Sequence, residues 1–85
     1  MRVQRLVPDL AIEIVSASDT FEKLAKKALR YRACGTQEVW IFCQVTRQAY
    51  LYSEQRRASL DENDEFRPET IPGFAIRIGD LLDRY

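Results

Sequence analysis

Residues 8–16, with the sequence PDLAIEIVS, form a short apolar run that carries two carboxylates and lies just before an amphipathic segment. Apolar side chains dominate this run, which predicts a β-strand. Because successive side chains of a strand turn to opposite faces, Asp9, Ala11 and Glu13 share one face. A straight strand would hold the two acids about 13 Å apart. A kink or twist at the strand start, where the ring of Pro8 fixes φ, could bring both acids onto one ion.

A helix is predicted from about Thr20 to Cys34. Asp19 followed three residues later by Glu22 is the pattern of a capping box at a helix start. Gly35 is suited to the left-handed conformation that commonly follows the last helical turn. We therefore expect one main helix directly after the first strand.

This predicted helix has an apolar face and a basic face. At about 100° per residue the apolar side chains share one arc, and Lys27 lies at its margin, one turn before Tyr31. The stem of Lys27 can follow the apolar seam while its ammonium group reaches the edge of the sheet. The apolar arc consists of Phe21, Leu24, Ala25, Ala28 and Leu29, and the opposite side carries Lys23, Lys26 and Arg30.

The second half of the chain predicts several more strands. Glu38–Cys43 is an apolar run typical of a central strand that is covered on both faces. Ala49–Tyr52 is its expected hairpin partner, and Arg57–Leu60 is a further strand. Shorter elements are expected at Glu65–Phe66, at Phe74–Ile76 and in a terminal helix from Gly79 to Asp83. This order predicts an α/β fold with a mixed β-sheet, one main amphipathic helix and a short C-terminal helix.

Composition narrows the chemistry that this chain can perform. Its 85 residues predict a single domain, 1–85, and its net charge of zero provides no strong overall attraction for polyanions. The absence of histidine excludes hydrolases that need an imidazole base or ligand. Catalysis would have to use carboxylates, lysine and activated water. Cys34 and Cys43 are too far apart in the sequence for a CxxC motif. The sequence shows no secretory leader and no apolar segment long enough to span a membrane, so we expect a cytoplasmic protein with no membrane partner.

Four motifs in order resemble one protein family over nearly the whole chain. They are PDLAIEIVS at residues 8–16, Lys27-x-x-x-Tyr31, CGTQEVWI at residues 34–41, and IPGF at residues 71–74. Together they resemble the Uma-two family of putative restriction endonucleases, within the PD-(D/E)XK nuclease superfamily.

The resemblance implies a restriction-endonuclease-like core and a Mg²⁺-dependent (or Mn²⁺-dependent) endonuclease that hydrolyses DNA phosphodiester bonds. It implies that Asp9 and Glu13 bind the metal and that both are catalytic. Superfamily members often carry a lysine two residues after the second acid, where this chain has Val15. The resemblance assigns that catalytic role to Lys27, whose ammonium group would stabilise developing negative charge.

This sequence departs from the family pattern at its start, because members usually have a helix and further strands before the PDL motif. We therefore expect a truncated relative with an exposed sheet edge and a homo-oligomer that forms through that edge. Whether the chain is an enzyme stays open at this point. The alternatives are a catalytically silent interaction module and a small nucleic-acid-binding domain, and the zero net charge and scarcity of aromatic residues on the basic face disfavour the latter.

Overall fold

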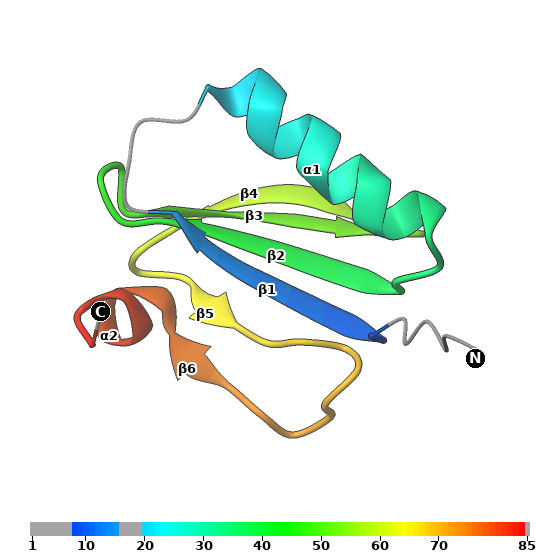
Figure 1. Cartoon of the computed structure of the whole chain (residues 1–85). Coiled ribbons are helices and arrows are strands. Elements are labelled where there is room, and N and C mark those ends of the chain that lie inside the picture. Colours follow the sequence, from blue (N-terminus) through cyan, green and yellow to red (C-terminus); the bar gives the residue numbers. More distant parts are fainter. Residues whose placement is uncertain (1–7, 16–19, 85) are drawn as a thin grey trace, which may run out of the picture.

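The computed structural model describes residues 8–15 and 20–84, which form a mixed four-stranded sheet with elements on both faces. The order in the sheet is β1-β2-β3-β4 (Figure 1). β1 (Leu10–Val15) pairs in parallel with β2 (Glu38–Cys43), and α1 (Phe21–Ala33) connects them. β3 (Gln48–Ser53) and β4 (Arg57–Asp61) follow as antiparallel hairpins. The predicted α/β fold, with one main helix and a mixed sheet, is confirmed.

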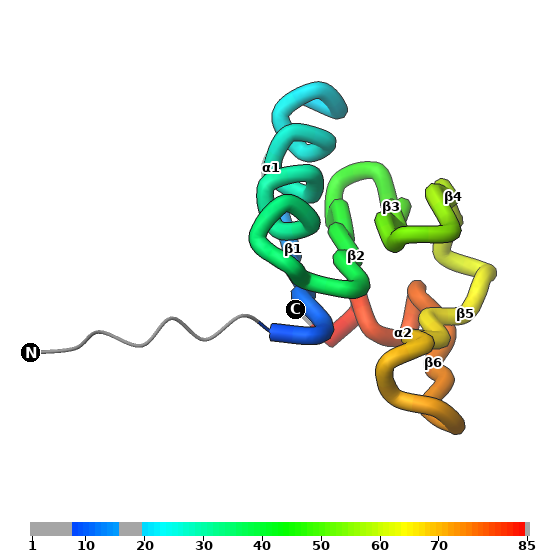
Figure 2. Tube along the Cα trace, turned by 90° about the vertical axis from the view of Figure 1, so that its right-hand side faces the viewer, coloured from blue at the N-terminus to red at the C-terminus, as the bar shows by residue number. Residues whose placement is uncertain are grey.

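The face of the sheet opposite α1 carries a small second layer. β5 (Glu65–Phe66) and β6 (Ile76–Arg77) form an antiparallel pair, and α2 (Ile78–Leu82) follows directly. Figure 2 shows α1 and this second layer on opposite sides of the sheet. The expected short strand ending at Ile76 is shifted, because Phe74 and Ala75 lie outside β6 and Arg77 is inside it.

β2 lies between two hydrophobic clusters, and all six of its residues are buried. On the α1 side Val39 and Ile41 pack with Leu24 and Ala28, and on the other side Phe42 packs with Phe66 and its neighbours. Alternation along one strand therefore supplies the walls of both clusters. The prediction of a central strand covered on both faces is confirmed.

The start of α1 differs from the predicted capping box. The N-cap is Thr20, whose hydroxyl accepts a hydrogen bond from the Lys23 backbone N–H at 3.2 Å. Glu22, which was expected to complete the box, is exposed and pairs instead with Lys26 at 3.8 Å. Asp19 lies outside the described residues. At the other end Gly35 has a φ of 103°, which confirms the predicted left-handed residue after the helix.

The buried part of the apolar arc of α1 is narrower than the sequence predicted. Leu24 and Ala28 are buried, but Phe21 is 61% exposed and Leu29 is 45% exposed. These two side chains lie on the flank of α1 that faces β3 and β4. With Tyr50 and neighbouring residues they line an open groove of about 300 Å³. The helix covers the first strands of the sheet and leaves part of the β3–β4 face open.

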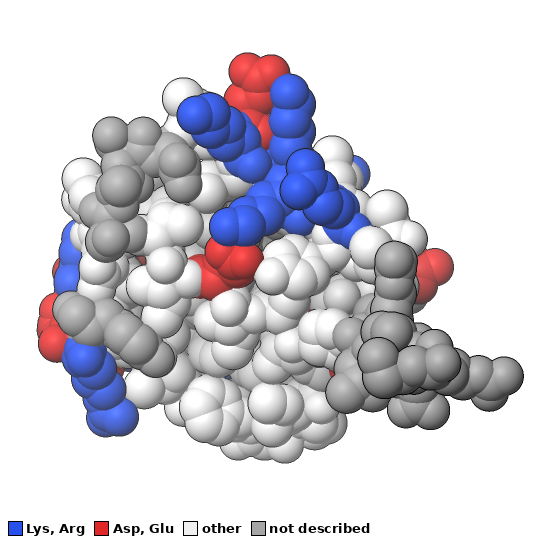
Figure 3. All heavy atoms as spheres, viewed as in Figure 1, with Lys and Arg blue, Asp and Glu red and all other residues white. Residues whose placement is uncertain are grey.

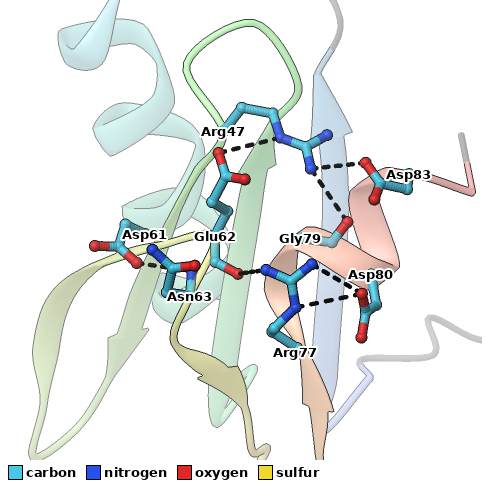
Figure 4. Close-up of polar contacts among 8 residues, drawn as sticks. All are labelled: Arg47, Asp61, Glu62, Asn63, Arg77, Gly79, Asp80 and Asp83. Atoms are coloured by element: carbon cyan, nitrogen blue, oxygen red, sulfur yellow. Dashed lines mark hydrogen bonds and ion pairs between the residues drawn. The ribbon is translucent and has the colours of Figure 1, made fainter.

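Ion pairs fix the second layer to the sheet (Figure 4). Arg47, in the β2–β3 turn, donates to the Asp83 carboxylate at 2.7 Å and to the Gly79 carbonyl at 3.3 Å. The same guanidinium lies 3.5 Å from the Glu62 carboxylate, and Arg77 donates to the Glu62 carbonyl at 3.1 Å. Arg47 has a φ of 58°, which is unusual for a residue other than glycine. These contacts join turns that are distant in sequence.

Candidate active site

Glu13 lies near the middle of β1, on the face that α1 covers. Its strand neighbour Ala11 is 7% exposed and belongs to the cluster beneath the helix. The Glu13 side chain is only 21% exposed, although β1 has no partner strand on its outer side within the described residues. β1 therefore presents a carboxylate at the sheet edge, partly shielded by the helix above it.

Two side chains of α1 hold this carboxylate. The Lys27 ammonium lies 2.8 Å from Glu13 Oε2, and the Tyr31 hydroxyl donates to Glu13 Oε1 at 2.9 Å. Lys27 and Tyr31 are four residues apart, so they project one above the other from the same side of the helix. The prediction that the Lys27 ammonium reaches the sheet edge is confirmed. Tyr31 was not among the predicted site residues, although its spacing from Lys27 was the signal that could have identified it.

These contacts change the acidity of both partners. The hydrogen bond from Lys27, aided by that from Tyr31, holds the Glu13 pKa below its ordinary value of 4.5, against the opposing effect of burial. The hydrogen bond to Glu13 raises the Tyr31 pKa above its ordinary value of 10.0. At neutral pH, Glu13 is therefore a carboxylate and Tyr31 a protonated donor. The stability that these contacts provide is present above the unfolded-state pKa of Glu13 and is lost as the pH falls through the lowered folded-state value.

Asp9 is exposed and directly precedes β1. Its backbone carbonyl accepts a hydrogen bond from the Glu38 N–H at 3.1 Å, which continues the parallel ladder to the strand start. Residues 10–15 pair with β2 in unbroken register, so this part of β1 contains no kink. A regular strand places residues four apart at about 13 Å. The structure thus brings Lys27 to Glu13, and leaves Asp9 at the far end of the same strand.

The oxygen atoms of the Glu13 carboxylate are suitable ligands for a hard divalent cation. Mg²⁺ prefers oxygen ligands and commonly keeps several waters while using one or two protein carboxylates. Each Glu13 oxygen has one hydrogen-bonding or ion-pair partner from α1, and a carboxylate oxygen has a second lone pair to offer. Across residues 8–15 and 20–84 no three acidic or cysteine side chains form a cluster that could hold an ion. Glu13 fits such an ion if water or phosphate oxygens complete its coordination, whereas Asp9, four residues earlier on the regular strand, is too distant to share the ion in this arrangement.

Glu38 is a second buried carboxylate, and its role differs from that of Glu13. It is 1% exposed, and its Oε2 accepts from Trp40 Nε1 at 2.8 Å and from the Glu69 N–H at 3.0 Å. Its Oε1 accepts from the Thr70 N–H at 3.1 Å and from the Thr70 hydroxyl at 3.0 Å. The sequence pattern identifies Glu38 only as the start of a strand. The structure makes it the anchor that fixes residues 69 and 70 to β2.

Comparison with known proteins agrees with this architecture. Residues 2–79 match the Uma2 family, which is described as "Putative restriction endonuclease". The chain belongs to the Uma2 family. A similar fold occurs in a solved protein titled "putative nuclease belonging to DUF820" from Anabaena variabilis, with 27% sequence identity and a TM-score of 0.72. The match covers 93% of this Uma2 chain and 46% of that protein, so this chain spans about half of the solved relative.

No curated protein matches the chain. The family match confirms the resemblance seen in the four sequence motifs, and the structural match confirms the nuclease-like α/β core. Neither helix of the described part of this Uma2 protein is long and apolar enough to cross a bilayer. Of the two cysteines, Cys34 is exposed and Cys43 is buried.

Proposed function

We propose that this Uma2 chain is a divalent-metal-dependent endonuclease that hydrolyses DNA phosphodiester bonds, with Mg²⁺ or Mn²⁺ as its cofactor. The observation that carries the proposal is the Glu13 carboxylate held between the Lys27 ammonium and the Tyr31 hydroxyl at the edge of the sheet. A carboxylate ligand next to a lysine suits metal-dependent phosphodiester hydrolysis, because one group can bind the cation and the other can stabilise anionic charge.

Each side chain has a distinct role in this proposal. Glu13, ionised well below neutral pH, would hold the ion, and Asp9 would share it only if the start of β1 bends toward Glu13 when the ion binds. A bound divalent ion supplies Lewis acidity at the phosphate and eases the deprotonation of water. Lys27 would offset the negative charge that grows on the phosphate oxygens during attack. Tyr31 is a positioning residue, because its hydrogen bond fixes the orientation of the Glu13 carboxylate.

Metal affinity tests this division of roles. Because the Lys27 ammonium lies 2.8 Å from a Glu13 oxygen, it repels a cation bound there. We expect Lys27→Met to tighten Mn²⁺ binding about tenfold while lowering cleavage at least about a hundredfold. We expect Asp9→Asn to weaken Mn²⁺ binding on the order of tenfold, since a charged ligand is lost. Isothermal titration calorimetry with Mn²⁺, paired with plasmid nicking, measures both quantities.

The control for this titration is Lys26→Met, one residue away on the exposed side of α1. It removes the same charge without touching Glu13 and should change Mn²⁺ affinity less than about twofold. Unchanged affinity in Asp9→Asn would remove Asp9 from the site and leave Glu13 as the protein ligand. Weaker Mn²⁺ binding in Lys27→Met would contradict the proposed arrangement.

The alternative function is a catalytically silent member of the family that acts as an interaction module. The observation that favours it is the separation of Asp9 and Glu13 along an unkinked strand. Parent protein that neither binds Mn²⁺ nor nicks plasmid DNA, while remaining folded, would contradict the endonuclease and favour this alternative.

We also propose that the protein self-associates through the outer edge of β1. The Glu38 and Gln44 N–H groups donate to the carbonyls of Asp9 and Val15. The backbone N–H and C=O groups of the odd-numbered residues of β1 therefore point toward β2. The alternation of a strand then directs the backbone groups of Leu10, Ile12 and Ile14 outward. Within residues 8–15 and 20–84 no strand pairs with these outward groups. Such an edge, beside the 47% exposed Ile12 side chain, favours addition of a strand from a second copy.

Two substitutions of Ile12 distinguish the contribution of its backbone N–H to self-association from the contribution of its side chain. We expect the parent protein to sediment as a dimer or larger assembly at micromolar concentration and Ile12→Pro to sediment as a monomer. Proline removes an outward N–H that β2 does not use. Ile12→Thr keeps that N–H and should remain associated. A monomeric parent at high concentration in analytical ultracentrifugation would contradict the proposal.

A further inference from the structure

Charge in this protein is segregated between the two faces of the sheet, although the net charge is zero. α1 carries five basic residues and one acid, Glu22. Figure 3 shows Lys and Arg side chains gathered over α1, with a carboxylate directly below them. The second layer has the opposite excess. Its acids are Glu62, Asp64, Glu65, Glu69, Asp80 and Asp83, and its bases are Arg67, Arg77 and Arg84.

The basic residues of α1 are also concentrated on one side of the helix. At about 100° per residue, Lys23, Lys26, Lys27 and Arg30 fall within a sector of about 100°. Lys27 forms the margin of this sector nearest the sheet, and it contacts Glu13. The fifth basic residue, Arg32, projects elsewhere and donates to the Thr36 carbonyl at 2.8 Å. The basic sector therefore begins at the candidate active site and extends along one shoulder of the helix.

Two members of this sector are available for an external anion. Within residues 8–15 and 20–84, neither Lys23 nor Arg30 forms an ion pair, and both are exposed. They are seven residues apart, which is about 10 Å along the helix axis. One strand of a nucleic acid duplex presents a phosphate about every 3.4 Å of axis, so this length matches about three phosphates. Arg30 also shares an open groove of about 230 Å³ with Lys27 and Tyr31, next to Glu13.

We propose that the α1 shoulder formed by Lys23, Lys27 and Arg30 binds the phosphate backbone of duplex DNA and directs one phosphate toward Glu13. This inference rests on the proposed function, and it adds the surface that receives the substrate. In this arrangement one phosphate lies beside Lys27, and Lys23 and Arg30 contact the phosphates that flank it. Because these contacts are made to phosphates, they determine the position of the duplex and not its sequence preference.

Fluorescence anisotropy with a labelled duplex of about 20 base pairs, in EDTA and from about 50 to about 200 mM NaCl, tests the surface without cleavage. We expect the double variant Lys23→Gln/Arg30→Gln to raise Kd at least about tenfold. The slope of log Kd against log salt concentration should fall by about 1.8, since each phosphate contact contributes about 0.9. The matched control, Arg67→Gln/Arg84→Gln, removes the same charge from the second layer and should change Kd less than about twofold.

The outcomes separate this surface from the proposed chemistry. Equal weakening by the two double variants, or no binding by the parent at the lowest salt, would overturn the inference. Parent protein that cleaves with Mg²⁺ while the α1 double variant keeps full affinity would overturn the surface and leave the endonuclease standing. Binding that depends on the α1 residues, without cleavage by any preparation, would support the surface and count against the endonuclease. Thermal melting by circular dichroism verifies that each variant is folded.

Discussion

Glu13→Gln should abolish Mg²⁺-dependent nicking of plasmid DNA and leave the protein folded. The amide cannot carry the negative charge that holds a divalent cation, and loss of one such ligand raises the barrier by several kcal/mol. This corresponds to a decrease in rate of at least about a hundredfold. Glutamine keeps the size of the side chain and can still accept from one of its two α1 partners. Agarose-gel conversion of supercoiled to nicked plasmid measures the effect.

The control for this experiment is Glu22→Gln, which removes an equal charge from the exposed surface of α1. It should retain activity within about twofold, because the Glu22 pair with Lys26 is exposed and contributes little. A pH profile gives an independent check on the parent. The Glu13 pKa lies below 4.5, so ionisation of this ligand should not limit activity between pH 5 and neutrality. Equal nicking by Glu13→Gln and the parent would refute the assigned site.

Glu38→Gln should produce the largest loss of stability among the conservative substitutions. The carboxylate of Glu38 accepts four hydrogen bonds while it is 1% exposed. An amide nitrogen in place of one oxygen would face two donors. The Thr70 hydroxyl can rotate to become an acceptor, but the Thr70 N–H would then lose its partner. We expect the free energy of unfolding to fall by about 2–5 kcal/mol, measured by urea denaturation.

The exposed residue Glu54, in the β3–β4 turn, offers the matched control. Glu54→Gln should change the free energy of unfolding by less than about 0.5 kcal/mol. A domain of this size has a total stability of only about 5–15 kcal/mol, so Glu38→Gln removes a considerable share. If both variants unfolded at the same urea concentration as the parent, the anchoring role of Glu38 would be wrong.

The elements that sequence reasoning predicted correctly are those with strong local patterns. Glu38–Cys43 is an unbroken apolar run, and the α1 segment has a clear helical period and a glycine at its end. The position predicted for β6 was wrong, because this strand is placed by pairing with Glu65–Phe66, about ten residues earlier. No local sequence pattern encodes that register. The exposure of Phe21 and Leu29 was also missed. Helical periodicity identifies an apolar side, but tertiary packing decides how much of that side is covered.

The candidate site was predictable in part for a similar reason. Strand alternation placed Glu13 on one face, and the helical period brought Lys27 to the margin that meets it. Tyr31 follows from the same period but was not assigned a role, because tyrosine beside an apolar arc is commonly a core residue. Glu38 could not be recognised as a buried anchor, since its partners at residues 69 and 70 come from more than thirty positions later.

The separation of basic and acidic side chains onto opposite faces of the sheet gives this electrically neutral molecule a large dipole moment. An isoelectric point near 6.2 would suggest weak retention on any charged resin at neutral pH. The molecule instead offers α1 to a cation exchanger and the α2 side to an anion exchanger. The same asymmetry would turn the protein as it approaches a polyanion, so that α1 arrives first and collisions become productive more often than random orientation allows.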